Sequence, residues 1–178
     1  HISKVGYHFL LQNKKSSSPG SDKSIQSRIG KRMIDEMEGD VQYLIGPGST
    51  TAVIMQQLDL KNTLLGVDLI KNKQLVENDL NEHSILTHIQ NIPSKLIITP
   101  TGGQGYLLGR GNQQLSPDVL NQINTDNIII IATINKLASI PNNTLLVDTS
   151  DPILDEKISG YRKIITDDIS TTIYKITP

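Results

Sequence analysis

The chain has 178 residues, and its 17 basic and 18 acidic side chains give a formal net charge of −1. At about 150 residues per domain this length favours one compact domain, and the balanced charge gives no drive toward nucleic acid or an anionic membrane surface. The absence of cysteine excludes disulfides, thiolate-bound zinc, iron–sulfur clusters and cysteine nucleophiles. Any catalysis must therefore use oxygen, imidazole or amine groups.

Residues 1–21 are predicted to be a strand followed by a flexible loop. Ile2–Leu11 has the composition of a strand, and Gln12–Ser21 is polar, with the Ser, Pro and Gly content of a linker. Because the chain starts with His1 rather than Met, we expect these residues to connect to an upstream domain that is missing from the sequence. Residues 22–178 are then predicted to be a single α/β domain that binds a nucleotide or phosphate.

A helix and then an alternation of strands and helices are predicted after this loop. Ile25, Ile29, Met33 and Met37 recur at four-residue spacing, which indicates an amphipathic helix that begins near Asp22. Apolar runs then alternate with polar turns and helical segments, as in a parallel sheet with crossover helices. Strands are predicted at Val41–Ile45, Thr63–Asp68, Lys95–Thr99, Asn127–Thr133 and Thr144–Asp148, and helices at Thr50–Leu58, Asp79–Gln90, Pro117–Ile123 and Pro152–Ser159.

The last two apolar runs, Arg162–Thr166 and Thr171–Ile176, flank a polar turn and predict a C-terminal β-hairpin. The expected fold class is therefore α/β, with a mostly parallel sheet flanked by helices and a C-terminal β-hairpin. No apolar run approaches the ~18 residues needed to cross a bilayer, so we expect a cytoplasmic protein.

Small and hydroxyl-bearing residues follow the strand predicted at Val41–Ile45. A strand that leads through a Gly-x-Gly-Ser-Thr turn into a helix directs backbone N–H groups and the positive end of the helix at one point, which suits a phosphate. The alternative is a plain turn in which Ser49 or Thr50 caps the helix. The candidate phosphate-binding residues are Gly46, Gly48, Ser49, Thr50 and Thr51.

Five glycines fall within ten residues after the strand predicted at Lys95–Thr99. Glycine is unfavourable in regular structure, so this density predicts that the backbone closely approaches a ligand at the carboxyl end of the strand. Arg110 offers a bidentate fork for phosphate, and Asn112 offers an amide to a base or ribose. We predict that Gly102–Gln114 lines a ligand site, the alternative being a solvated loop. The candidates here are Thr101, Gly102, Gly103, Gln104, Gly105, Arg110 and Asn112.

Carboxylates at predicted strand ends form a third set of candidates. Asp68 and Asp148 close two predicted strands, at the edge where open parallel sheets bind ligands. Each is suited to coordinate Mg²⁺ bound to phosphates, to accept ribose hydroxyls, to act as a general base or to cap a helix. For Asp79 and Asp151, which precede helical segments, capping is the favoured interpretation.

Several motifs together resemble the ATP–NAD kinase-like family, in the branch of predicted inorganic polyphosphate/ATP–NAD kinases that includes proteins beside acetoin catabolism operons. The resemblance is to the C-terminal half of these proteins and covers nearly the entire chain. The matching segments are YLIGPGSTT (43–51), TLLGVDLI (63–70), DLNE (79–82), IITPTGGQGYLLGRGNQQLSP (97–117), IATINKL (131–137) and LLVDTSDPILDEKISGYRKIIT (145–166).

The resemblance implies a phosphotransferase in which ATP or polyphosphate, with Mg²⁺, donates a phosphoryl group to NAD or another nucleotide. Asn81 and Glu82 resemble the family's Asn-Glu pair that holds NAD hydroxyls. Thr99–Gly102 resembles a stretch that lines the nucleotide site, although Gly103–Tyr106 replaces its usual Ser-Thr-Ala-Tyr continuation. On this hypothesis Asp68 is the metal ligand or catalytic base. The family's upstream Gly-Gly-Asp-Gly-Thr motif is not in the sequence, so we expect no NAD phosphorylation by this chain alone.

Two other functions stay open at this point. One is a non-catalytic module that binds a nucleotide or builds an oligomer. The other is a sugar-phosphate isomerase-like enzyme, in which Asp68 or Glu82 is the proton-transfer base. We also expect a homo-oligomer, with no nucleic-acid partner and no membrane partner.

Overall fold

The computed structural model describes residues 21–178, and the strand and most of the loop predicted at the N-terminus lie outside them. In chain order the elements are α2 (Ser21–Glu36), β1 (Gln42–Ile45), α3 (Ser49–Gln57), β2 (Asp68–Lys71), β3 (Gln74–Glu77), α4 (Glu82–Ile89), β4 (Ser94–Ile98), β5 (Tyr106–Leu108), α5 (Pro117–Ile123), η1 (Thr125–Asn127), β6 (Ile128–Ile131), α6 (Ile134–Ser139), η2 (Pro141–Asn143), β7 (Thr144–Val147), α7 (Pro152–Ile158), β8 (Gly160–Ile165) and β9 (Thr171–Thr177).

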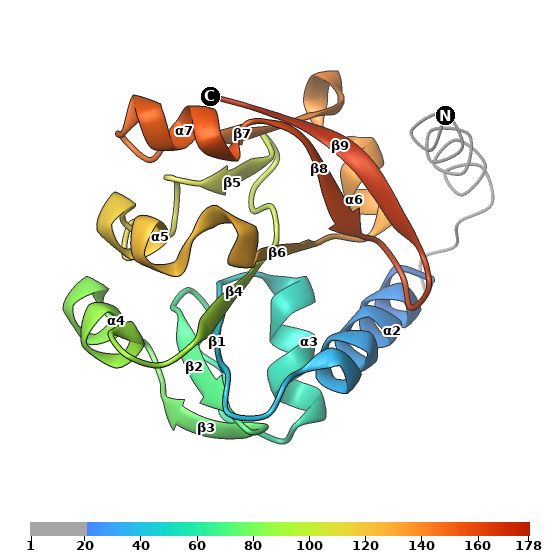
Figure 1. The fold of residues 1–178 in the computed structure, drawn as a ribbon. Helices are drawn as coiled ribbons and strands as arrows, with labels where there is room; N and C mark the ends of the chain where they lie inside the picture. Colours follow the sequence, from blue (N-terminus) through green and yellow to red (C-terminus); the bar gives the residue numbers. More distant parts are fainter. Residues whose placement is uncertain (1–20) are drawn as a thin grey trace.

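The strands of this range form one nine-stranded sheet in the order β3-β2-β1-β4-β6-β8-β9-β7-β5 (Figure 1). Neighbouring strands from β1 through β4 and β6 to β8 are parallel, while β2 and β3 extend the sheet as antiparallel strands. At the other side β8 and β9 form an antiparallel pair from Gly160↔Ile176 to Ile165↔Thr171. The predicted α/β class, the mostly parallel sheet and the C-terminal β-hairpin are therefore confirmed.

The two faces of the sheet bury different apolar clusters because successive residues of a strand point to opposite sides. In β1, Leu44 joins the cluster that contains residues of α4, α5 and α7. Its neighbours Tyr43 and Ile45 join the cluster built with Ile25 and Ile29 of α2 and residues of α3. The periodicity that predicts the amphipathic helix α2 is thus confirmed by its buried face.

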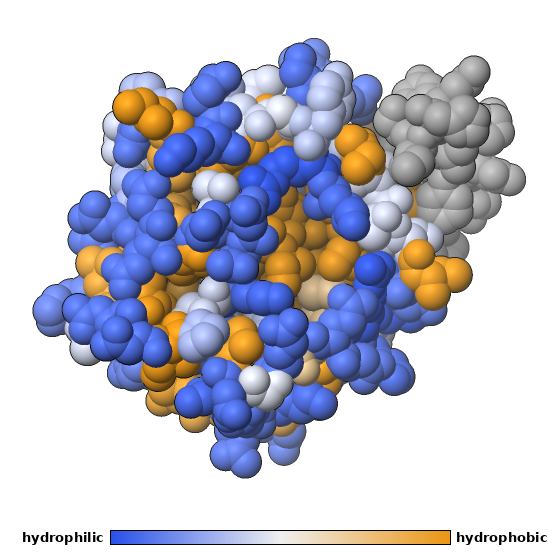
Figure 2. All heavy atoms as spheres, in the orientation of Figure 1, coloured by the Kyte–Doolittle hydropathy of each residue, from blue (hydrophilic) through white to orange (hydrophobic). Residues whose placement is uncertain are grey.

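The outer surface carries the polar residues that this packing leaves outside. The face seen in Figure 2 is largely hydrophilic, with hydrophobic side chains visible in a central hollow and at a few protruding positions near the edges. Within residues 21–178, no helix is long and apolar enough to cross a membrane.

One predicted strand is wrong over most of its length. Residues 63–67 of the strand predicted at Thr63–Asp68 are irregular, and β2 begins only at Asp68. The apolar run misleads because Leu64 and Leu65 are exposed rather than buried. Gly66 bends the segment against Asp79, since a Cβ at this glycine would lie 2.4 Å from the Asp79 carboxylate oxygen.

Other differences concern short elements. Three elements that were not predicted, β3, β5 and α6, each have six residues or fewer. The helix predicted at Asp79–Gln90 begins at Glu82, because Asn81 and not Asp79 caps it. Asp151 does cap α7, as predicted, and accepts hydrogen bonds from the amides of Ile153 and Leu154.

Candidate functional site

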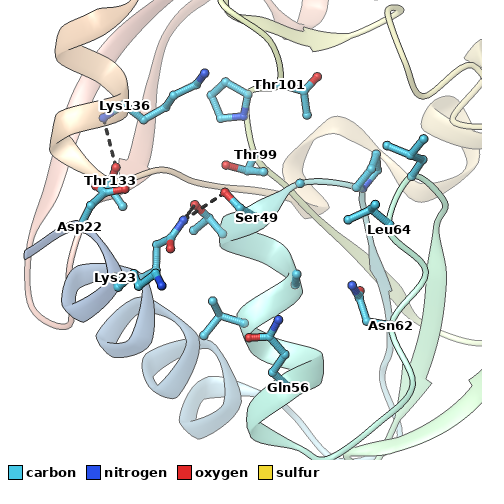
Figure 3. Close-up of a pocket in the computed structure, with 18 of the residues that line it drawn as sticks. Asp22, Lys23, Ser49, Gln56, Asn62, Leu64, Thr99, Thr101, Thr133 and Lys136 are labelled. Atoms are coloured by element: carbon cyan, nitrogen blue, oxygen red, sulfur yellow. Dashed lines mark hydrogen bonds between the residues drawn. The ribbon is translucent and has the colours of Figure 1, made fainter. Parts of the chain in front are cut away.

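A cavity of about 970 Å³ opens at the carboxyl ends of β1, β4 and β6 (Figure 3). These three strands are adjacent and parallel, so the segments that follow them meet at one edge of the sheet, where α/β folds bind ligands. The cavity has the size of a small-molecule site, which is roughly 300–1,000 Å³. Its lining includes Pro47–Thr50 after β1, Thr99–Gly102 after β4, Thr133 after β6, and the start of α2.

The helix α3 begins at this cavity without a side-chain cap. Its N-cap residue is Gly48, which has no side chain to cap the helix, and no side chain among residues 21–178 accepts a hydrogen bond from the amides of the first turn. The helical hydrogen bonds of α3 begin with the amide of Ala52, which donates to the carbonyl of Gly48 at 3.1 Å. The amides of residues 49–51 therefore have no acceptor within the helix. The alternative in which Ser49 or Thr50 caps the helix is therefore wrong, and the positive end of α3 faces the cavity uncapped.

Packing between two strand ends requires the glycine at position 48. Its φ of +133° lies in the region that favours glycine, and a Cβ there would lie 2.4 Å from Cγ2 of Thr99. The hydroxyl of Thr51 donates to the carbonyl of Gly46 at 2.7 Å, and the Thr51 side chain is buried. Thr51 therefore braces the turn from inside instead of facing the cavity.

The hydroxyls of Ser49 and Thr50 contact a side chain of α2. Nε2 of Gln26 donates to Oγ of Ser49 and to Oγ1 of Thr50, at 3.1 Å in each case. Figure 3 shows these contacts as dashed lines at the start of α3. α2 thus lies directly over the turn in which the sequence predicts phosphate binding.

Hydroxyls from the end of β4 also face the cavity. Thr99 is only 4% exposed, lines the cavity, and makes no side-chain hydrogen bond within the described residues. Thr101 lies beside it on the cavity wall (Figure 3). The Thr99 hydroxyl is therefore available to form a hydrogen bond with an occupant of the cavity.

Lysines outnumber carboxylates in the cavity lining among residues 21–178. Lys23 from α2 and Lys136 from α6 line it, together with Asp22. Nζ of Lys136 donates to the carbonyl of Gly102 at 2.8 Å, which holds this ammonium group at the cavity edge. The lysines and the α3 terminus together favour an anion.

The glycines of the glycine-rich segment have two kinds of surroundings. A Cβ at Gly109 would lie 1.8 Å from the carbonyl oxygen of Asp148, and one at Gly105 would lie 2.7 Å from Cγ2 of Ile140. Gly105 and Gly109 therefore pack against other parts of this chain. For these two glycines, the prediction that the backbone approaches a ligand is wrong. Gly102 and Gly111 have open space around the Cβ position, and both line the cavity.

Arg110 and Asn112, the polar candidates of this segment, contact β5 and the loop that follows it. The guanidinium of Arg110 lies 4.7 Å from the ring centroid of Tyr106, and the side chain is exposed outside the cavity lining. Asn112 is buried, accepts from the amide of Gly109 at 3.0 Å and donates to the carbonyl of Leu107 at 3.1 Å. Both ends of its amide are therefore used within the loop. The exposed Gly103 and Gln104 do not line the cavity either.

Asp68 lies at the predicted edge of the sheet, although it begins a strand there instead of ending one. It is the first residue of β2, which runs antiparallel to β1, so Asp68 lies opposite Ile45 at the carboxyl end of β1. Its buried carboxylate accepts hydrogen bonds from the amide of Thr63 at 2.8 Å, the side chain of Asn78 at 3.0 Å and the amide of Asp79 at 3.0 Å. Asp68 is thus a brace for the irregular 61–67 segment.

These surroundings of Asp68 do not fit a metal ligand or a catalytic base. Its oxygens are already engaged by N–H donors, and the residue is 1% exposed. Within the part of the chain that the structure describes, no group of three or more acidic or histidine side chains is placed to hold a metal ion. No step is therefore assigned to a protein-bound metal.

The Asn81-Glu82 pair lies at the start of α4 and is separate from the cavity lining. Oδ1 of Asn81 accepts from the amide of Ser84 at 2.8 Å and caps this helix. Glu82 is exposed in the first helical turn. The structure therefore does not join this pair with the Gly48 turn in one site.

Sequence reasoning missed several residues of the cavity wall. Lys23, Gln26, Asn62 and Lys136 come from α2, the irregular segment before β2, and α6. Lys23, Gln26 and Asn62 lie outside the motifs singled out in the sequence, and Lys136 lies in IATINKL (131–137), to which no binding role was assigned. Only the packing of distant elements brings them together.

A family model described as the ATP-NAD kinase C-terminal domain matches residues 38–176. The matched range contains the Gly48 turn, the Thr99–Gly102 stretch and Lys136, whereas α2 lies before it. Neither a curated protein nor a solved structure matches the chain.

Proposed function

The chain belongs to the ATP-NAD kinase C-terminal domain family, and we propose that its cavity binds the phosphate groups of a nucleotide substrate at the start of α3. Membership makes the chain part of an NAD kinase-like phosphotransferase, for which NAD and ATP are the implied substrates. The observation that carries the proposal is the uncapped helix N-terminus that opens into a cavity lined by two lysines.

The chemistry of the lining suits phosphate. The N–H groups of the first turn of α3 and the helix dipole attract an anion. The hydroxyls of Thr99 and Thr101 supply neutral donors, and the ammonium groups of Lys23 and Lys136 supply charge. Ser49 retains its hydroxyl proton for a ligand, because its oxygen accepts from Gln26.

The same donors suit ATP and inorganic polyphosphate, since both present a chain of phosphate oxygens. In this proposal Mg²⁺ enters with the phosphoryl donor and is held by phosphate oxygens, which are hard ligands of the kind that this ion prefers. The described residues contribute positioning of the phosphates and charge stabilisation, which are the main protein contributions in phosphoryl transfer.

The isomerase-like alternative loses support because its two candidate bases are elsewhere. The carboxylate of Asp68 is buried and hydrogen-bonded, and Glu82 is not part of the cavity lining. A proton-transfer base must reach its substrate within hydrogen-bond distance or through one water.

Calorimetric titration of the chain with ATP, NAD and inorganic tripolyphosphate tests the proposal. Lys136→Gln removes one ammonium group from the cavity and is expected to weaken ATP and tripolyphosphate binding about tenfold, or ~1.4 kcal/mol. Lys163→Gln is the matched control, because Lys163 is an exposed lysine of β8 outside this cavity. Equal affinities in wild type and Lys136→Gln, or no binding of any of the three compounds, would overturn the proposal.

A further inference from the structure

Two leucines of the irregular 61–67 segment face the cavity without an apolar cover. Leu64 is 74% exposed and Leu65 is 78% exposed, and both line the cavity. Figure 3 shows Leu64 on the side opposite Lys23 and Lys136, with the start of α3 between them. The cavity therefore has a cationic half and an apolar half.

Hydrogen bonds hold the segment before and after the leucines, and the one after them runs from the amide of Leu80 to the carbonyl of Val67 at 2.8 Å. The amide of Thr63 donates to the Asp68 carboxylate at 2.8 Å, and Nδ2 of Asn78 donates to the carbonyl of Lys61 at 2.8 Å. Gly66 packs against Asp79, since a Cβ there would lie 2.4 Å from an oxygen of the Asp79 carboxylate. An exposed apolar pair on a braced segment favours an occupant that covers it, because burial of apolar surface is favourable.

Two side-chain amides lie on the same side of the cavity wall, with Asn62 between Leu64 and Gln56 in Figure 3. Asn62 and Gln56 line the same cavity, and neither side chain makes a hydrogen bond to any residue that the structure describes (Figure 3). A carboxamide presents a donor and an acceptor side by side. Adenine presents the complementary pair at its N6 and N7 atoms, which Asn and Gln side chains read as a bidentate pair.

We propose that Leu64, Leu65, Asn62 and Gln56 form a subsite for the adenine base of the nucleotide whose phosphates bind at the start of α3. This inference rests on the proposed function, since it places the base of the same ligand. The apolar leucines cover a face of the base and the amides bind its edge. The subsite favours adenine nucleotides over inorganic phosphate chains, which have no base.

The experiment compares ATP with inorganic tripolyphosphate on the chain and on the double variant Leu64→Ser with Leu65→Ser. The variant is expected to lose at least about tenfold in affinity for ATP through lost apolar contact, and to bind tripolyphosphate as the wild type does. Ile153→Ser is the matched control, because Ile153 is 73% exposed in α7, outside the cavity lining, and should change neither affinity.

Asn62→Ala tests the edge contacts separately. Wild type is expected to bind ATP more tightly than GTP. The ratio of the two affinities should fall toward one in the variant, because alanine forms no hydrogen bond with either base. Unchanged ATP affinity in the leucine variant, or a parallel loss of tripolyphosphate binding, would overturn the subsite. Wild-type affinities that are equal for ATP and tripolyphosphate would also overturn it while leaving the phosphate site intact. If wild type binds neither compound, the proposed function itself fails.

Discussion

Single glycines decide how closely two parts of this backbone approach each other. At Gly48 the turn packs against the side chain of Thr99, and at Gly109 it packs against the backbone of Asp148. At Gly103, in contrast, a Cβ would meet nothing within 4 Å. Packing therefore requires some glycines of the glycine-rich segment, such as Gly109, but not others, such as Gly103.

Gly109→Ala is expected to destabilise the fold by about 3 kcal/mol or more, because overpacking adds to the strain of positive φ. Its Cβ would lie 1.8 Å from a backbone oxygen, at a φ of +96°. Gly103→Ala should change the free energy of unfolding by less than ~0.5 kcal/mol. Urea denaturation of both variants measures the difference, and equal stabilities would contradict the packing role.

The phenol of Tyr174 links β9 to α6, the helix that carries Lys136. Its hydroxyl donates to the carbonyl of Leu137 at 2.9 Å, and burial raises the pKa of Tyr174 to about 12. A raised pKa means that the stabilisation is present below the ordinary value of 10.0 and is lost as the pH rises through about 12.

Tyr174→Phe removes this hydrogen bond and is expected to lower the free energy of unfolding by about 1–2 kcal/mol at neutral pH. The difference between wild type and variant should shrink as the pH rises from 10 toward 12, because the phenol ionises in the unfolded wild-type chain before it ionises in the folded one. Denaturant titrations of both proteins across this range provide the measurement. A difference that stays constant with pH would argue against the buried, protonated phenol.

At the scale of elements, α2 is fastened to the loop between β8 and β9. Arg28 donates to both carboxylate oxygens of Asp167, at 2.6 and 3.0 Å. Arg32 reaches the carbonyls of Asp167 and Ser170, each at 3.3 Å. Since α2 contributes Lys23 to the cavity, this attachment connects the C-terminal hairpin with the proposed phosphate site.

The attachment predicts a pH dependence. Burial raises the pKa of Asp167, but the hydrogen bonds from Arg28 and from the amide of Asp168 lower it by more, so the net pKa lies below its ordinary 3.8. A lowered pKa means that the stabilisation is present above pH 3.8 and is lost as the pH falls through the folded-state value.

Asp167→Asn is therefore expected to reduce stability and ATP affinity at neutral pH, with a stability difference from wild type that disappears in acid. Asp35→Asn is the control, because it removes a carboxylate of α2 that forms only an exposed pair with Lys31. Thermal denaturation at neutral and acidic pH, with ATP titrations at neutral pH, measures both effects. Identical behaviour of the two variants would contradict the role of the attachment.

Periodicity predicts the elements whose burial follows a regular pattern. The four-residue spacing of Ile25, Ile29 and Met33 predicts α2, and all three side chains are buried. The same reasoning fails at Leu64 and Leu65, because an apolar run does not reveal whether another element covers it. Local signals also miss β5, since its three residues lie between glycines.

At the scale of the whole molecule, sheet order determines which predicted residues share a site. The parallel arrangement of β1, β4 and β6 brings the Gly48 turn and the Thr99–Gly102 stretch together, as expected for strand ends of a parallel sheet. Lys23 and Lys136 join them through long-range packing, which the sequence pattern does not predict. Asn81 and Glu82 resemble a family motif yet lie at another helix start.

The central claim is that nucleotide phosphates bind the first turn of α3. Titration of the isotope-labelled chain with ATP, followed by NMR of the backbone amides, tests it most directly. Progressive shifts of the Ser49 and Thr50 amide signals are expected with ATP and with tripolyphosphate, at ligand concentrations that match the affinities measured by calorimetry. ATP binding that leaves both signals in place, while signals elsewhere in the chain move, would contradict it.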